Sequence, residues 1–151
     1  MPKLTVNEQA GDFTDVIKLT YVDLQNIGNG GQKVIATIPA GGGVDLCAVY
    51  ESVAFAGTTT LVIDVGTTTG DPDEFIDALD VDAMSAPVAN TGDVFVQAAG
   101  TTTIAGGSLP VKLVQAATDV VIEVTDAAIA SATAGEIVIG LRIIDLGRFA
   151  S

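Results

Sequence analysis

The chain has 151 residues, the size of one ordinary domain, and its formal net charge is −13 because six lysines and arginines face nineteen aspartates and glutamates. A surface of this charge repels phosphate backbones and anionic lipids, so we expect neither nucleic acid nor a membrane as a partner. The sequence contains no histidine and a single cysteine, which excludes Ser-His-Asp and Cys-His nucleophiles and thiolate metal sites. Without an internal disulfide, a membrane-spanning apolar run or a secretory signal, we expect a soluble chain made in a reducing cytoplasm.

The predicted elements are mostly strands, because Val, Ile, Thr, Ala and Gly dominate the composition. Residues 1–14 contain few apolar side chains, and we interpret them as an N-terminal arm before a single domain over residues 15–151. Apolar runs bounded by Gly, Pro and Asn predict the strands. They cover residues 15–24, 33–38, 44–55, 61–65, 94–98, 111–115, 120–125 and 136–145. Strands at this spacing, without alternating helices, predict an all-β fold, an antiparallel β-sandwich of jelly-roll type.

One segment carries the signature of a helix start. Asp71 is a suitable N-cap, Pro72 suits the first helical position, and Glu74 stands where a capping box needs an acidic side chain. A short apolar stripe follows, made of Phe75, Ile76 and Leu79. The pattern predicts one short helix over residues 72–80.

Acidic side chains crowd the same segment, namely Asp71, Asp73, Glu74, Asp77, Asp80 and Asp82. We interpret them as charges that favour the positive end of a helix dipole and as a solvated face. Calcium binding is an alternative, although the spacing is not that of an EF-hand. A carboxylate-pair hydrolase is another alternative, which the absence of tryptophan and the scarcity of aromatic residues disfavour. We therefore assign no catalytic, cofactor-binding or metal-binding residue and predict a non-enzymatic protein without a cofactor.

Three further side chains stand out because their types are scarce. Cys47 lies in an apolar run and is predicted to be a small buried hydrophobe rather than a reactive thiol. Arg142 shares one face of its strand with Val138 and Gly140. For Arg142 and Arg148 we expect ordinary surface positions, with an ion pair to a neighbouring subunit as the alternative.

The order of segments over residues 61–146 resembles small virion proteins of tailed phages, which include capsid decoration proteins and head-associated knob proteins. The resemblance is carried by a strand at residues 61–65, D-P-D-E-F-I-D-A-L at 71–79, T-G-D-V-F-V at 91–96 and the closing strand T-A-G-E-I-V-I-G-L-R-I-I-D-L at 133–146. It implies a homotrimeric β-sandwich on the outer surface of the phage head, bound to the major capsid protein and made in the host cytoplasm. It also implies that the arm, residues 1–14, contributes to that contact.

The resulting hypothesis is a non-enzymatic virion structural protein that binds the capsid lattice and stabilises or decorates the head. A receptor- or glycan-binding knob of a tail or head fibre is the alternative. In that case the threonine-rich loops at residues 67–69 and 101–103 would face the host surface.

Overall fold

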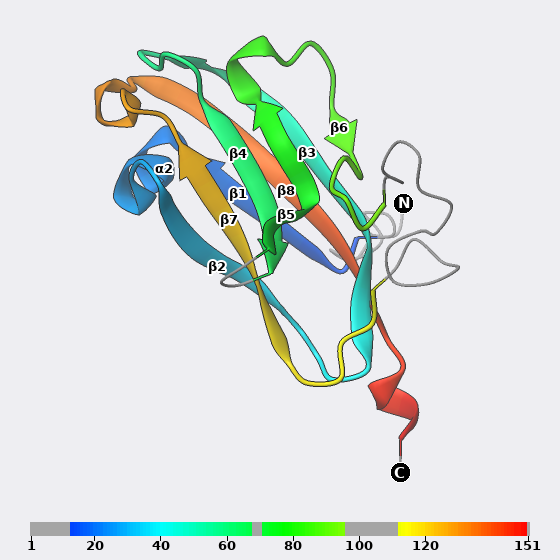
Figure 1. Cartoon of the computed structure of the whole chain (residues 1–151). Coiled ribbons are helices and arrows are strands. Elements are labelled where there is room, and N and C mark those ends of the chain that lie inside the picture. The colour runs from blue at the N-terminus through cyan, green and yellow to red at the C-terminus, as the bar shows by residue number, and fades with distance from the viewer. Residues whose placement is uncertain (1–12, 68–70, 96–111, 151) are drawn as a thin grey trace, which may run out of the picture.

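The computed structural model describes residues 13–67, 71–95 and 112–150. Two four-stranded antiparallel sheets pack face to face, as Figure 1 shows. Sheet A contains, in spatial order, β1 (Asp15–Thr20), β8 (Ala134–Asp145), β3 (Gly42–Ala56) and β6 (Val88–Ala89). Sheet B contains β2 (Gly31–Ile38), β7 (Thr118–Thr125), β4 (Val62–Thr67) and β5 (Asp71–Asp80). The predicted antiparallel sandwich is confirmed, and these strand orders are those of an eight-stranded jelly roll.

The core lies between the two sheets and is built from alternate residues of the central strands. Successive side chains of a strand point to opposite faces, so every second residue of β7 and β8 turns inward. These fully buried residues are Val120, Ile122 and Val124 on β7 and Ile137, Ile139 and Leu141 on β8. Burial of each such side chain contributes about 1.5–3 kcal/mol, which fixes the register of both sheets.

The predicted helix over residues 72–80 is wrong, because this segment forms strand β5 and pairs with β4. Helix-capping signals are local and contribute only about 1 kcal/mol. Phe75 and Ile76 gain more by entering the core, where their exposed fractions are 2% and 0%. Pairing with β5 also satisfies the backbone of β4, whose Ile63 lies opposite Leu79.

The α-helix of the described residues is α2 (Tyr21–Ile27), and its first four residues replace the end of the strand predicted over residues 15–24. Its start is a capping box: the Thr20 N–H donates to Oδ2 of Asp23 at 2.8 Å, and the Asp23 N–H donates to Oγ1 of Thr20 at 3.4 Å. The Thr20 N–H, together with the Thr20 hydroxyl, which donates to the same carboxylate oxygen at 3.0 Å, holds the pKa of Asp23 below its ordinary value. The helix ends at Gly28, whose φ of 81° suits glycine.

Smaller differences concern the short connections. Strand β6 was not predicted, and three 3₁₀ turns complete the described chain: η1 (Val81–Ala83), η2 (Ile129–Ser131) and η3 (Gly147–Phe149). Two predicted strands are not formed by their described residues. Residues 94 and 95 of the strand predicted over 94–98 lie in a turn, and residues 112–115 of the strand predicted over 111–115 are irregular. Residues 1–12 of the predicted arm lie outside the described residues. Among the described residues, no helix is both long and apolar enough to span a membrane.

Candidate functional site

The outer face of sheet A is the first candidate surface. Because Ile137, Ile139 and Leu141 point inward, Val138 and Gly140 point outward from β8. Strand register then sets the neighbours of these two outward positions across the sheet. Gly140 lies between Val16 and Ala48, and Val138 lies between Lys18 and Tyr50.

Phe13 covers Gly140 on this outer face. A Cβ atom at position 140 would lie 2.7 Å from the Phe13 ring, so glycine is what allows the ring to approach the sheet this closely. Beside the ring is an apolar groove of about 220 Å³. Its lining includes Phe13, Val16, Tyr50, Pro87 and Val138. Val16 and Tyr50 are 50% and 51% exposed, so large apolar side chains face solvent here.

Charged pairs flank this apolar groove on the same face. The Arg142 Nε donates to Oδ1 of Asp45 at 2.7 Å, and the Lys18 ammonium lies 3.5 Å from Glu136. Arg142 is therefore a partly exposed residue with an ion-pair partner in its own chain.

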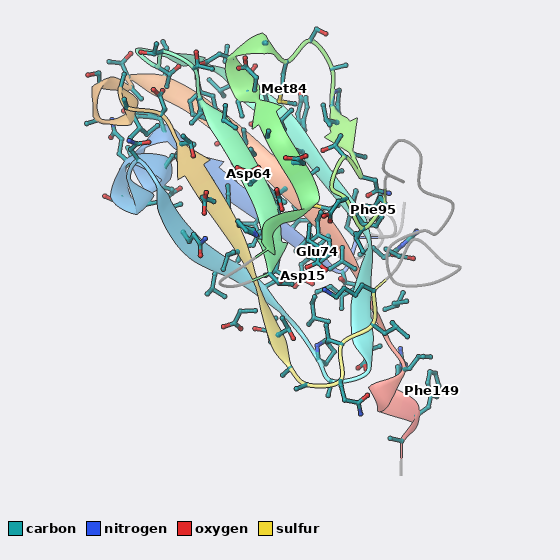
Figure 2. The ribbon with its side chains drawn as sticks, viewed as in Figure 1. Asp15, Asp64, Glu74, Met84, Phe95 and Phe149 are labelled. Atoms are coloured by element: carbon teal, nitrogen blue, oxygen red, sulfur yellow. The ribbon has the colours of Figure 1, made fainter. Side chains whose placement is uncertain are left out.

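The outer face of sheet B is acidic, in contrast to sheet A. Asp64 on β4, labelled in Figure 2, lies opposite Glu123 on β7. Burial is the largest cause that raises the pKa of Asp64 above the ordinary aspartate value. The N–H of Ala78 donates to Oδ1 of Asp64 at 2.6 Å and opposes this change, whereas the carboxylates of Glu123, Asp73 and Asp77 reinforce it.

We expect Asp64→Asn to raise the melting temperature by a few degrees at about pH 7, because the amide oxygen keeps the acceptor for Ala78 without the charge. A raised carboxyl pKa means that the folded state binds the proton more tightly than the unfolded state does. The penalty from the charged form is therefore complete above the folded pKa and disappears as the pH falls below the unfolded pKa. The gain should shrink towards about pH 4 in thermal unfolding scans.

Asp119→Asn is the matched control for this substitution. It removes one charge from an exposed position on the same sheet, where the carboxylate accepts a hydrogen bond from Thr37 at 3.0 Å. An equal, pH-dependent gain in both variants would mean that net charge alone, and not the surroundings of Asp64, sets the effect.

Two acidic side chains of this segment, Glu74 and Asp82, hold other parts of the chain in place. Glu74 on β5, labelled in Figure 2, has a side chain that is only 3% exposed and lies 3.0 Å from the Lys112 ammonium. Its second oxygen accepts the Thr67 hydroxyl at 2.8 Å. Asp82 accepts the Leu61 N–H at 2.8 Å. The interpretation of these acids as a helix face is wrong because the segment is a strand, whereas Asp77 and Asp82 are exposed to solvent as that interpretation expected. Across residues 13–67, 71–95 and 112–150, no three cysteine or carboxylate side chains are placed to hold a metal ion.

The remaining sequence candidates are a thiol and two loops. Cys47 is fully buried, as predicted, and burial raises the pKa of its thiol to about 12, so the reactive thiolate is suppressed. In the two threonine-rich loops, Thr67 closes β4 and bonds Glu74. Residues 68–69 and 101–103 lie outside the described residues.

The similarity of this chain to known proteins is found in structure and not in sequence. No protein-family model matches the chain, and no curated protein matches it either. Two solved capsid structures contain a matching chain, each with a TM-score of 0.51. The chain resembles phage capsid chains. One is from the structure described as the acidic stable capsid of Helicobacter pylori bacteriophage KHP30, with 14% identity over 86% of this chain and 88% of that one. The other is from the capsid of Ralstonia phage GP4, with 15% identity over 88% of this chain and 86% of that one. At this identity the likeness is one of fold.

Proposed function

We propose that this chain is a non-enzymatic structural component of a tailed-phage virion, which binds the major capsid protein lattice on the outer surface of the head and decorates or stabilises it. The observation that carries the proposal is the match of its jelly roll to chains of two phage capsid structures, over at least 86% of every chain involved. A match of that extent concerns the whole sandwich and not one shared hairpin.

The contrast between the two outer faces supports a role in an assembly. A protein that sits on a lattice buries one surface and turns another towards solvent. Sheet B carries charged carboxylates such as Asp64 and Glu123 on its outer face, which suits exposure to water. Sheet A carries the apolar groove on its outer face, which suits contact with protein.

The segment before Phe13 is the part of the chain that we propose for lattice contact. Thr14 fixes the start of the sandwich, since its N–H donates to the Leu141 carbonyl at 2.8 Å and its hydroxyl accepts the Ile143 N–H at 2.9 Å. Residues 1–12 precede this anchored point in the sequence, and they are the binding arm that we propose.

Deleting residues 2–12 should weaken binding to expanded heads at least about tenfold, the size of effect expected when an interface loses its main contact segment. The melting temperature should not change, because the hydrogen bonds of Thr14 remain. Co-sedimentation of purified chain with heads that lack it measures the first quantity, and thermal unfolding measures the second.

A chain with residues 2–12 in scrambled order is the matched control, since it keeps length, composition and charge. It should bind as weakly as the deletion. Undiminished binding by the deletion variant would contradict the role of the arm, and failure of the 151-residue chain to bind heads at all would contradict the proposed function.

A further inference from the structure

The turn that joins α2 to β2 contains an asparagine followed by a glycine, the dipeptide in which an asparagine side chain loses ammonia most readily. Asn29 and Gly30 form this dipeptide, and none of the other asparagines of the chain, Asn7, Asn26 and Asn90, is followed by glycine. Both residues are exposed to solvent, and Gly30 has a φ of 74°, which suits glycine in a turn. The turn therefore presents the reactants of a spontaneous modification to water.

Deamidation proceeds through a new bond inside this dipeptide. The backbone nitrogen of Gly30 attacks Cγ of Asn29, so that the N–Cγ bond forms and the Cγ–Nδ2 bond breaks. Ammonia leaves with the proton that Gly30 gives up. Water then opens the succinimide ring at either carbonyl and leaves aspartate or isoaspartate at position 29. The reaction thus needs a free Gly30 N–H, a side chain of Asn29 that can turn towards it, and water.

The folded chain holds both reacting groups on the end of β7. The Gly30 N–H donates to the Val124 carbonyl at 2.7 Å, so the proton that must leave is engaged in a hydrogen bond. Oδ1 of Asn29 accepts the N–H of Asp126 at 3.0 Å, which fixes the direction of the side chain. Cyclisation has to break the first of these hydrogen bonds and reorient the side chain that makes the second.

The product of the reaction does not fit this turn. In isoaspartate the main chain runs through the side-chain carbon, which lengthens the backbone before Gly30 by a further atom. The turn then cannot keep both its bond to the Val124 carbonyl and its acceptor for the Asp126 N–H. Asp126 is 3% exposed, so a donor left there without a partner costs stability. Its carboxylate also accepts the N–H of Thr59 at 3.1 Å and of Ala128 at 2.9 Å, which extends the disturbance to both neighbours.

We propose that Asn29–Gly30 is a modification site that the folded turn keeps closed: deamidation takes place when residues 28–31 leave β7, and isoaspartate then prevents their return. The ladder between β2 and β7 begins at the pair Gly31 and Val124, so loss of the turn frees the first residues of the edge strand β2. Modification therefore makes a transient opening of this edge permanent. The inference goes beyond the proposed function, because it concerns the chemical lifetime of the fold and not contact with the lattice.

Incubation of the folded chain and of the same chain in guanidinium chloride, in one mildly alkaline buffer, tests the protection. Trypsin releases residues 19–33 as one peptide, since Lys18 and Lys33 flank it, and mass spectrometry then follows deamidation at Asn29. Asn26 lies in the same peptide and precedes isoleucine, whose branched side chain hinders cyclisation, so it is the internal comparison. We expect Asn29 to deamidate at least about tenfold more slowly in the folded chain, because the rate follows the population of the open turn. In guanidinium chloride, deamidation at Asn29 should exceed that at Asn26.

Gly31→Ala opens the turn without changing the dipeptide, because a Cβ atom at position 31 would lie 2.1 Å from the Ile27 carbonyl oxygen. Gly147→Ala is the matched control, since its Cβ atom would lie 2.3 Å from the Ala40 carbonyl oxygen. Figure 1 shows α2 and the C-terminal turn η3 at opposite ends of the sandwich. We expect several-fold faster deamidation of Asn29 in folded Gly31→Ala, and an unchanged rate in Gly147→Ala.

Equal rates in the folded and the unfolded chain would overturn the protection, and an intact Asn29 in guanidinium chloride would overturn the site itself. Equal acceleration by both variants would mean that global stability, and not the turn, keeps the site closed, which also overturns the proposal. The comparison of the folded with the unfolded chain needs neither variant, so it decides the matter if Gly31→Ala fails to fold.

Discussion

Phe75→Ala is expected to destabilise the chain by about 3–5 kcal/mol, the cost of removing a large aromatic side chain from a packed core. Phe75 is 2% exposed on β5, and its ring centroid lies 6.1 Å from that of Phe95 in a tilted arrangement. The substitution removes this aromatic contact and leaves a cavity between the sheets. Since domains are typically stable by about 5–15 kcal/mol, urea unfolding should show a large fall in the midpoint.

The control for this prediction is Val34→Ala, which shortens an apolar side chain that is 49% exposed on the edge strand β2. We expect it to change the free energy of unfolding by less than about 1 kcal/mol. A small effect of Phe75→Ala, comparable to that of Val34→Ala, would contradict the placement of β5 against the core.

Lys112→Met is expected to cost about 2–3 kcal/mol, because it leaves the Glu74 carboxylate buried without its ion-pair partner. The two charged groups are 3.0 Å apart, and the side chain of Glu74 is 3% exposed. Loss of a partner from a fully buried pair costs about 3–5 kcal/mol, and we expect less here because the lysine side chain is 53% exposed. Methionine retains most of the apolar stem, so the measured loss reports mainly on the charge.

Lys18→Met provides the comparison for this effect. Lys18 pairs with Glu136 at 3.5 Å, but its side chain is 65% exposed, and pairs of this kind contribute about 0–1 kcal/mol. Chemical unfolding of both variants under the same conditions separates the two cases. Equal losses would mean that the burial of Glu74 has no energetic consequence. Glu74→Gln combined with Lys112→Met should recover part of the stability, since the uncompensated charge is then absent.

The strands that the sequence predicted correctly are those in which side-chain alternation and burial agree. On β8, Ile137, Ile139 and Leu141 repeat every second residue, and this period is also the one that the core imposes. The buried position of Cys47 followed from the same local apolarity.

The sequence wrongly predicts a helix over residues 72–80, because the local signals for a helix start conflict with the long-range packing of this segment as a strand. Its first residues satisfy the rules for a helix start, whereas Phe75 and Ile76 are adjacent in sequence and both buried. Burial of Glu74 depends on Lys112, which follows β5 only after a long connection. No local pattern connects these two residues, so the ion pair could not be predicted from the sequence.

The composition of the candidate surface on sheet A depends on which strands pair and in which register. The strand period predicted that Val138 and Gly140 share a face, and this is confirmed because both residues line the groove. The presence of Val16 and Tyr50 beside them follows from the register of β1 and β3 on β8, which no local pattern specifies.

The central claim is that this chain sits on the outer surface of a phage head, and a cryo-electron microscopy comparison of heads with and without the purified chain tests it most directly. The proposal predicts added density outside the capsid shell, repeated with the symmetry of the lattice, into which the two-sheet jelly roll of Figure 1 fits. Heads that gain no density, or density confined to the tail, would contradict it.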